Sequence, residues 1–229
     1  MENSDPLALD PGFADRFEKA RKPGCQLYLI SPPAIDEGFA ARLKSALSGG
    51  PVAAFQLRLK GVGEEEIARL AEPLQRICAN ADVAFIVNDS MALAKKLGAD
   101  GVHLGQSDGN AKDARALLGP AAQIGVTCHN SRHLAMEAGE SGADYVAFGA
   151  FYETGTKKTD YIADLELIGW WNALFEVPSV AIGGITPANA VRLADAGADF
   201  VAASASIWSE PDGEAAAVAA FASALNLNG

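Results

Sequence analysis

Cysteine is scarce in this chain, which has three in 229 residues, at Cys25, Cys78 and Cys128. An odd number with no C-x-x-C spacing indicates neither a disulfide framework nor a zinc site. The opening segment, MENSDPLALDPG, also lacks the basic residues and the apolar core of a signal peptide. We therefore expect a protein that works in the reducing environment of the cytoplasm.

Basic residues and long apolar runs are also in short supply. Lys and Arg number 18 against 29 Asp and Glu, which gives a formal net charge of −11, whereas non-specific nucleic-acid binding relies on an excess of Lys and Arg. No apolar run approaches the roughly 20 residues that a membrane-spanning helix needs. Hydrophobic residues at 49% and charged residues at 21% are ordinary for a globular protein and exclude a disordered chain. We expect neither nucleic acid nor membrane as a partner, and the sequence leaves a homo-oligomer open.

No low-complexity linker divides the chain, and short apolar runs alternate with longer amphipathic stretches. The expected strands are Gln26–Ser31, Ala53–Lys60, Val83–Asp89, Gly101–Gly105, Gln123–Cys128, Tyr145–Ala150, Ser179–Ile185 and Phe200–Ile207. The expected helices include Glu64–Ala79, Met91–Leu97, Ala111–Leu118, Ser131–Ser141, Leu165–Phe175, Pro187–Ala196 and Gly213–Leu225. Three of these helices close on a glycine followed by Ala-Asp, at Gly98, Gly142 and Gly197, where glycine accepts the left-handed conformation that ends a helix.

Eight strand–helix units in succession predict parallel pairing, because each helix supplies the crossover that a parallel strand requires. The fold class expected is α/β, a single-domain (β/α)8 TIM barrel over residues 25–229. Periodicity alone leaves an open doubly wound sheet as the alternative. Residues 1–24 are expected to form an N-terminal extension with a short helix at Asp15–Arg21.

Polar and glycine residues gather where the predicted strands end. These residues are Arg58, Lys60, Asn88, Asp89, Gln106, Asp108, Thr127, His129, Gly183, Gly184 and Ser204. In a barrel such positions share the C-terminal rim, where the active sites of this fold are built. The rim is therefore the predicted functional site.

Two cations stand close together at this rim. Gln56, Arg58 and Lys60 alternate with apolar residues, so a period of two places all three on the interior face of their strand. Two neighbouring cations on one face need an anion between them. Either Asp89 from the next strand pairs with them in a structural ion network, or an anionic substrate binds there, and the desolvation cost of a purely structural pair favours the substrate.

Asp89 and Asp108 follow two adjacent predicted strands. Two carboxylates brought together favour Mg²⁺, which takes one or two carboxylates together with waters and substrate phosphate oxygens. Taken singly, Asp89 could cap a loop and Asp108 could cap the helix that begins at Ala111. Taken with the two cations, the pair predicts a diphosphate bound through Mg²⁺.

Two further segments are typical of phosphate binding. The run Tyr152–Lys158 offers hydroxyls, a glycine and lysines, and the glycines before Thr186-Pro187 let backbone N–H groups approach a phosphate at a helix start. Loops after strands seven and eight commonly form the phosphate site of a barrel. Two anion sites on one rim predict a reaction between two phosphorylated small molecules.

The three histidines differ in expected position. His133 lies in a predicted helix and is expected at the surface. His103, inside a strand, is more often a core histidine with satisfied nitrogens than a catalyst. His129 follows a strand at the rim and could act as acid or base.

Six motifs in this order resemble one known family. They are Gln56–Lys60 (QLRLK), Ile86–Asp89 (IVND), Gly98–Asp108 (GADGVHLGQSD), Ala143–Val146 (ADYV), Thr154–Lys157 (TGTK) and Ala181–Ile185 (AIGGI). Over about residues 25–210 the chain resembles thiamine phosphate synthase. The resemblance implies a (β/α)8 barrel that joins hydroxymethylpyrimidine diphosphate to a carboxylated thiazole phosphate, with release of diphosphate and CO2.

The resemblance also implies roles for individual residues. Diphosphate and pyrimidine contacts fall on Gln56, Arg58, Lys60, Asn88, Thr127 and Lys157, magnesium ligands on Asp89 and Asp108, and thiazole phosphate contacts on Thr154, Thr156, Gly184, Ser204 and Ala205. In the family's chemistry diphosphate leaves first, and the thiazole nitrogen then attacks the pyrimidine cation. Arg58, Lys60 and Lys157 would be the catalytic cations, so Lys157→Ala is expected to lower turnover strongly and leave the fold intact.

Two residues depart from the family pattern. Leu59 replaces the usual glutamate and is expected to point outward, toward the helices. Ala205 replaces the usual serine, between Ser204 and Ser206, which is a mild change if the backbone N–H makes the phosphate contact.

Two other functions compete with the synthase. The related thiazole tautomerase is an isomerase that would use His129 for proton transfer and would leave Lys60, Asp89 and Asp108 idle. A non-catalytic barrel that binds a phosphorylated metabolite is the third reading, since fold does not imply function. Retention of both aspartates favours the synthase.

Overall fold

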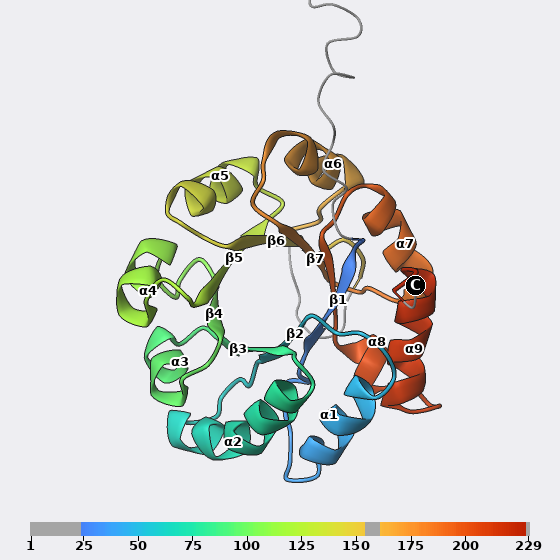
Figure 1. The fold of residues 1–229 in the computed structure, drawn as a ribbon. Helices are drawn as coiled ribbons and strands as arrows, with labels where there is room; N and C mark the ends of the chain where they lie inside the picture. Colours follow the sequence, from blue (N-terminus) through green and yellow to red (C-terminus); the bar gives the residue numbers. More distant parts are fainter. Residues whose placement is uncertain (1–23, 154–160, 228–229) are drawn as a thin grey trace, which may run out of the picture.

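Eight parallel strands close into a barrel that is ringed by helices (Figure 1). The computed structural model describes residues 24–153 and 161–227. The strands are β1 (Gln26–Ile30), β2 (Ala54–Leu57), β3 (Ala84–Asn88), β4 (Gly101–Leu104), β5 (Gln123–His129), β6 (Tyr145–Gly149), β7 (Ser179–Ile182) and β8 (Phe200–Ala203). The helices are α1 (Phe39–Leu47), α2 (Glu64–Asn80), α3 (Met91–Leu97), α4 (Ala111–Leu118), α5 (Arg132–Glu140), α6 (Leu165–Leu174), α7 (Pro187–Asp195), α8 (Ala205–Trp208) and α9 (Glu214–Ala224).

The pairing of the first and last strands separates a barrel from an open sheet. Each strand pairs in parallel with the next, and β1 also pairs with β8, where Leu27 lies opposite Val201. The predicted (β/α)8 barrel is therefore confirmed, and the open doubly wound sheet is wrong. The short helix expected at Asp15–Arg21 lies outside the described residues. No helix in the described part of the chain is long and apolar enough to cross a bilayer.

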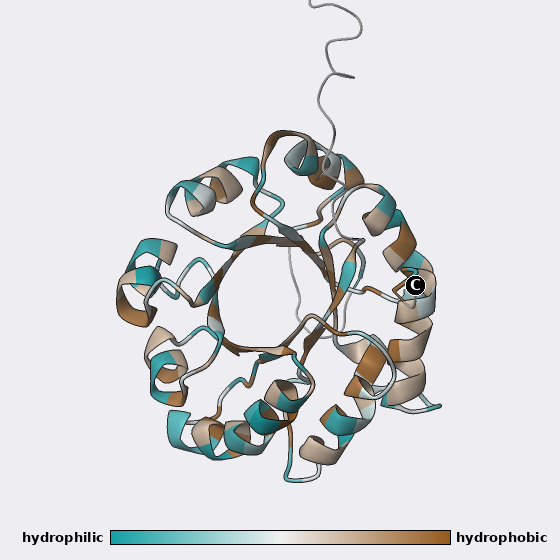
Figure 2. Ribbon diagram, in the orientation of Figure 1, coloured by the Kyte–Doolittle hydropathy of each residue, from teal (hydrophilic) through white to brown (hydrophobic). Residues whose placement is uncertain are grey.

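Successive strand residues point alternately to two hydrophobic layers. Leu27 and Leu29 of β1 pack outward in the large cluster beneath the helices, whereas Tyr28 and Ile30 pack inward, inside the barrel. Burial of both strand faces explains the continuous apolar runs in the sequence. Figure 2 shows that the hydrophobic strands are surrounded by a ring of helices, and that these helices are hydrophilic over part of their surface.

The end of the eighth strand differs from the prediction. The apolar run predicted a strand over Phe200–Ile207, but β8 ends at Ala203 and Ala205–Trp208 is helix α8. The carbonyl of Ser204 accepts from the N–H groups of Ile207 and Trp208, at 2.9 and 3.0 Å, so the chain turns there. Ile207 and Trp208 are still buried, and their apolar character concealed the boundary. Helix α1 was not singled out from the sequence.

The repeated Gly-Ala-Asp segments build the opposite, N-terminal end of the barrel. Gly98, Gly142 and Gly197 all have positive φ, of 60°, 88° and 102°, as the helix-ending role requires. The aspartate that follows each accepts a hydrogen bond from a backbone N–H of the preceding strand: Asp100 from Phe85 (2.7 Å), Asp144 from Ile124 (2.6 Å) and Asp199 from Ser179 (2.8 Å). Each segment therefore ends a helix and fixes the start of a strand.

Candidate active site

The predicted site residues that the structure describes lie together at the C-terminal rim. Gln56, Asn88 and Thr127 are in β2, β3 and β5, and the others follow the ends of β2, β3, β4, β7 and β8: Arg58, Lys60, Asp89, Asp108, Gly184, Ser204 and Ala205. Thr154, Thr156 and Lys157 lie outside the described residues. The strand ends therefore converge as the sequence predicted.

The cation of Lys60 donates a hydrogen bond to Asp89 Oδ2. Burial alone would raise the pKa of Asp89, but the hydrogen bond from Lys60 and a side-chain contact with Asp108 outweigh it, so the pKa is lowered. An ion pair between the ends of β2 and β3 is thus present, as the interpretation of a structural ion network required. The side chains are 52% and 34% exposed, and pairs so open contribute only about 0.2–1 kcal/mol, so a bound anion or cation can replace this pairing at small cost.

Asp89 and Asp108 face each other and do not cap helices. Ser90 caps α3 through Leu93 N–H and Asn110 caps α4 through Asp113 N–H, so the helix-capping role considered for Asp108 is wrong. Asp89 has a φ of 68°, a left-handed conformation that is uncommon outside glycine. Asp108 is held by the backbone N–H of Gly105, at 2.9 Å from Oδ2.

The two carboxylates suit a magnesium ion. Within residues 24–153 and 161–227, no group of three or more His, Cys, Asp or Glu side chains gathers to hold a metal. A pair of hard oxygen donors at an open rim is the donor set of a Mg²⁺ that completes its shell with water and phosphate oxygens. The residues present therefore fit the expected ion.

Ser31 holds the rim between β1, β2 and β8. Its hydroxyl lies 2.9 Å from the backbone N of Arg58 and 3.2 Å from the backbone O of the same residue. The hydroxyl of Ser204 donates to the carbonyl of Ser31 at 3.2 Å. Ser31 is buried and was missed from the sequence, although it ends the first predicted strand. Leu59, next to Arg58, is buried in the outer cluster, as expected.

The loops after β6, β7 and β8 meet at a tightly packed backbone turn. Gly184 has a φ of 63°, and a Cβ on it would lie 2.4 Å from the carbonyl oxygen of Glu153. Asn189 fixes this turn, because its amide donates to the carbonyl of Gly184 at 3.0 Å. The hydroxyl of Ser206 donates to the carbonyl of Ile185 at 2.7 Å and so joins α8 to the same turn.

The hydroxyls on either side of Ala205 are already used within the protein. Ser204 bonds to Ser31, and Ser206 bonds to Ile185. Ala205 begins α8, and the first N–H groups of a helix have no acceptor within it. A phosphate here would therefore meet backbone N–H groups, and the alanine at this position removes none of them.

A chain of hydrogen bonds crosses the barrel interior beneath the rim. Gln56 Nε2 donates to Tyr28 Oη at 3.0 Å, and Tyr28 Oη lies 3.0 Å from Tyr145 Oη. Tyr145 Oη lies 3.1 Å from His103 Nδ1, and His103 Nε2 lies 2.8 Å from Thr127 Oγ1. Two residues expected to bind substrate are thus linked through three buried side chains.

His103 is a core histidine with both ring nitrogens bonded, as predicted. Burial lowers its pKa to about 4, so the ring is neutral near pH 7. The sequence did not predict the roles of Tyr28 and Tyr145, because a tyrosine within an apolar run is expected to pack in the core. The strand alternation could have found them, since both lie on the face that carries Gln56 and His103.

The other two histidines also lie where predicted. His129 is the last residue of β5, and its ring stacks on Tyr161 with centroids 4.4 Å apart. His133 lies on α5 and is exposed, with Nε2 3.4 Å from Glu137. Of the two, only His129 stands at the rim.

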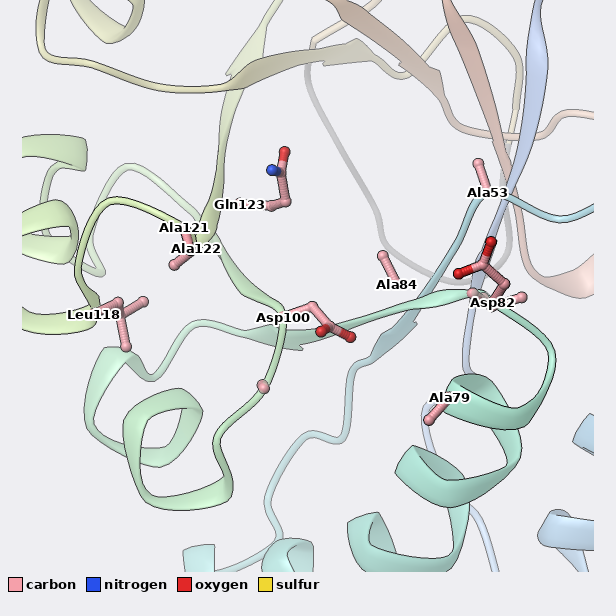
Figure 3. Close-up of a pocket in the computed structure, with 11 residues that line it drawn as sticks. Ala53, Ala79, Asp82, Ala84, Asp100, Leu118, Ala121, Ala122 and Gln123 are labelled. Atoms are coloured by element: carbon pink, nitrogen blue, oxygen red, sulfur yellow. The ribbon is translucent and has the colours of Figure 1, made fainter.

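A cavity of about 580 Å³ lies away from this site (Figure 3). It is lined at the starts of strands, by residues such as Ala84 and Gln123, and by Asp82 and Asp100. Strand starts form the N-terminal end of the barrel, opposite the rim. The cavity holds none of the predicted site residues, and Asp100 there already accepts from Phe85 N–H.

Comparison with known proteins identifies a family and related structures for this chain. The family model described as thiamine monophosphate synthase matches residues 27–207. The thiamine-phosphate synthase of Erythrobacter litoralis is 62% identical over 201 residues, which cover 86% of this chain and 93% of that protein. That of Rhodospirillum centenum is 55% identical over 198 residues, 86% and 96% of the two chains. The structure of a thiamine phosphate pyrophosphorylase from Pyrococcus furiosus superposes with a TM-score of 0.78 at 28% identity, covering 88% and 96%.

Proposed function

The chain belongs to the thiamine monophosphate synthase family, and we propose that it is a Mg²⁺-dependent thiamine-phosphate synthase. It is a transferase that acts on small molecules. In the proposed reaction, hydroxymethylpyrimidine diphosphate is coupled to carboxythiazole phosphate, which yields thiamine phosphate, diphosphate and CO2. The observation that carries this proposal is the meeting of Asp89 and Asp108 beside Lys60 at one rim.

The cations at the rim would bind the leaving diphosphate. Lys60 extends from the end of β2 and is half exposed, and its partner Asp89 holds it only weakly. Arg58 lies close enough for its charge to act on Asp89, and its backbone is fixed by Ser31. As negative charge develops on the departing group, Lys60, Arg58 and Lys157 would stabilise it.

Asp89 and Asp108 would hold the magnesium ion. When bound, Mg²⁺ supplies charge that neutralises the diphosphate oxygens. The low pKa of Asp89 keeps this carboxylate ionised at neutral pH and ready to act as a ligand. The Gly105 N–H bond to Asp108 keeps the second carboxylate oriented before a ligand arrives.

The turn at Gly184 and the start of α8 would bind the thiazole phosphate. Gly184 keeps the backbones of two loops in close contact, and Ser206 ties α8 to them. Loops after strands seven and eight commonly hold phosphate in this fold. Thr154 and Thr156 would complete the site.

The cysteines support a proposed cytoplasmic location. Cys25, Cys78 and Cys128 are buried and unpaired. Burial raises the pKa of each thiol to about 12, which keeps the thiols protonated and unreactive. A reducing compartment suits a chain of this kind.

The test of the function is to mix the purified protein with both phosphorylated precursors, with and without Mg²⁺. Formation of thiamine phosphate and diphosphate only with Mg²⁺ is expected. Lys157→Ala should lose most of this turnover, while Lys112→Ala, a change at an exposed residue of α4, should keep it. Isomerisation of the thiazole alone would select the tautomerase that uses His129. Binding without any reaction would select the non-catalytic barrel.

A further inference from the structure

The hydrogen-bond chain inside the barrel has a direction that its first donor sets. Gln56 Nε2 donates to Tyr28 Oη, so the proton of the buried Tyr28 hydroxyl is available for Tyr145 Oη, 3.0 Å away. The opposite sense would leave this proton without an acceptor in a side chain that is only 3% exposed. A buried donor without an acceptor is strongly unfavourable, so the Tyr28 hydroxyl donates to Tyr145.

The same sense continues to Thr127. Tyr145 then donates to His103 Nδ1, which must be the unprotonated nitrogen of the ring. The proton of the neutral imidazole is on Nε2 and is donated to Thr127 Oγ1, at 2.8 Å. The Thr127 hydroxyl, itself half-buried at the end of β5, keeps its own proton for an acceptor at the rim.

The fold makes room for this chain at one position in particular. The ring of Tyr145 crosses the barrel next to Gly125 of β5, where a Cβ would lie 2.0 Å from Tyr145 Cζ. Rings of His103 and Tyr145 stack at 5.6 Å, and those of Tyr28 and Tyr145 meet edge to face at 6.1 Å. The chain is thus held by packing as well as by hydrogen bonds.

We propose that Tyr28, Tyr145 and His103 are positioning residues that fix the hydrogen-bonding roles at the two ends of the chain. Gln56 is fixed with its amide oxygen as an acceptor, and Thr127 is fixed with its hydroxyl as a donor. Under the proposed function, the amino group of the pyrimidine substrate would donate to Gln56, and a ring nitrogen would accept from Thr127. The ligand part of this inference rests on the proposed function, whereas the tautomer of His103 does not.

The first test reads the tautomer directly. In the full-length protein labelled with ¹⁵N-histidine, the ring nitrogen chemical shifts of His103 are expected to show a protonated Nε2 and an unprotonated Nδ1. Tyr145→Phe removes the donor to Nδ1 and should shift that resonance, and Tyr28→Phe should do so more weakly. Tyr161→Phe removes a tyrosine hydroxyl that is not part of this hydrogen-bond chain, so the His103 signals should stay unchanged. A His103 protonated on Nδ1 in the unmodified protein would overturn the proposal.

The second test reads the specificity of the site. Preference for the aminopyrimidine diphosphate over its oxo analogue, as the ratio of kcat/KM values, should fall about tenfold in Tyr145→Phe, the value of one net hydrogen bond. Thr127→Ser should retain the preference, and Thr127→Val should lose it. An unchanged ratio in Tyr145→Phe would contradict the positioning role. If the protein had no synthase activity but His103 carried its proton on Nε2, the proposed function would be refuted and the hydrogen-bond chain would stand.

Discussion

The ammonium group of Lys60 and the carboxylate of Asp89 form an ion pair between the ends of β2 and β3. The pair joins the cation expected to meet diphosphate to the carboxylate expected to meet magnesium. Both side chains are substantially open to solvent, so the pair contributes little to stability and can rearrange when ligands bind. The relationship is best understood as a resting arrangement of the site.

Asp89→Asn should weaken magnesium binding and leave the fold intact. An amide keeps the size of the side chain but removes the charge that attracts the ion and Lys60. The Mg²⁺ concentration for half-maximal activity should rise at least about tenfold, as loss of a metal contact costs. A magnesium titration of activity measures this. Asp195→Asn removes an exposed carboxylate at the last residue of α7, on the side of the barrel opposite the rim, and serves as the control; an unshifted midpoint in Asp89→Asn would exclude Asp89 as a ligand.

The sequence predicted the eight strands because each is buried on both faces and each is followed by a turn or a helix. The position of polar residues at strand ends then placed the site at one rim without any structure. Boundaries were less accurate where apolar residues continue past a strand, as Ile207 and Trp208 do after β8. The barrel interior was harder still, because whether Tyr145 packs or donates depends on partners more than 40 residues away, such as His103.

Capping was also beyond the sequence. Asp108 and Asn110 are both good capping residues, and they stand two positions apart before α4. Only the actual start of the helix decides that Asn110 receives the N–H of Asp113 and that Asp108 is free to face Asp89. The roles of Thr154, Thr156 and Lys157 remain predictions.

Gly184→Ala should disturb the thiazole phosphate site. A Cβ would meet the carbonyl of Glu153 at 2.4 Å, and the left-handed φ itself costs an alanine about 1–2 kcal/mol. We expect a raised KM for the thiazole phosphate and a smaller change for the pyrimidine diphosphate. Gly119 has a similarly positive φ, of 91°, but a Cβ added there would meet nothing within 4 Å. Gly119→Ala therefore measures the effect of backbone strain without the effect of a steric clash. Equal KM values in the two variants would argue against a role for this turn.

Asp144→Ala should destabilise the protein without changing its catalytic activity. Asp144 accepts from the Ile124 N–H and from Arg115, both at 2.6 Å, at the N-terminal end of the barrel. Loss of a buried backbone partner costs about 1–3 kcal/mol. Urea unfolding should show that decrease in the free energy of unfolding, whereas kcat and KM at a temperature where the variant is folded should match those of the unmodified protein. A large loss of kcat would mean that this end of the barrel influences the rim.

Stability in acid should depend in part on the contact between α1 and α9. Burial would raise the pKa of Glu214, but the hydrogen bond and charge of Arg42 outweigh it, so the pKa is lowered in the folded state. A lowered folded-state pKa means that the stabilising effect is present above the unfolded value, near 4.5, and is lost as pH falls through the folded value. Glu214→Gln should therefore be less stable than the unmodified protein at pH 7, by no more than about 1 kcal/mol because Arg42 is 41% exposed. The two proteins should converge in stability as the pH falls through the lowered folded-state pKa of Glu214. Urea unfolding at several pH values measures the difference, and a gap that stays constant into strong acid would show that the charge of Glu214 is not the main contribution.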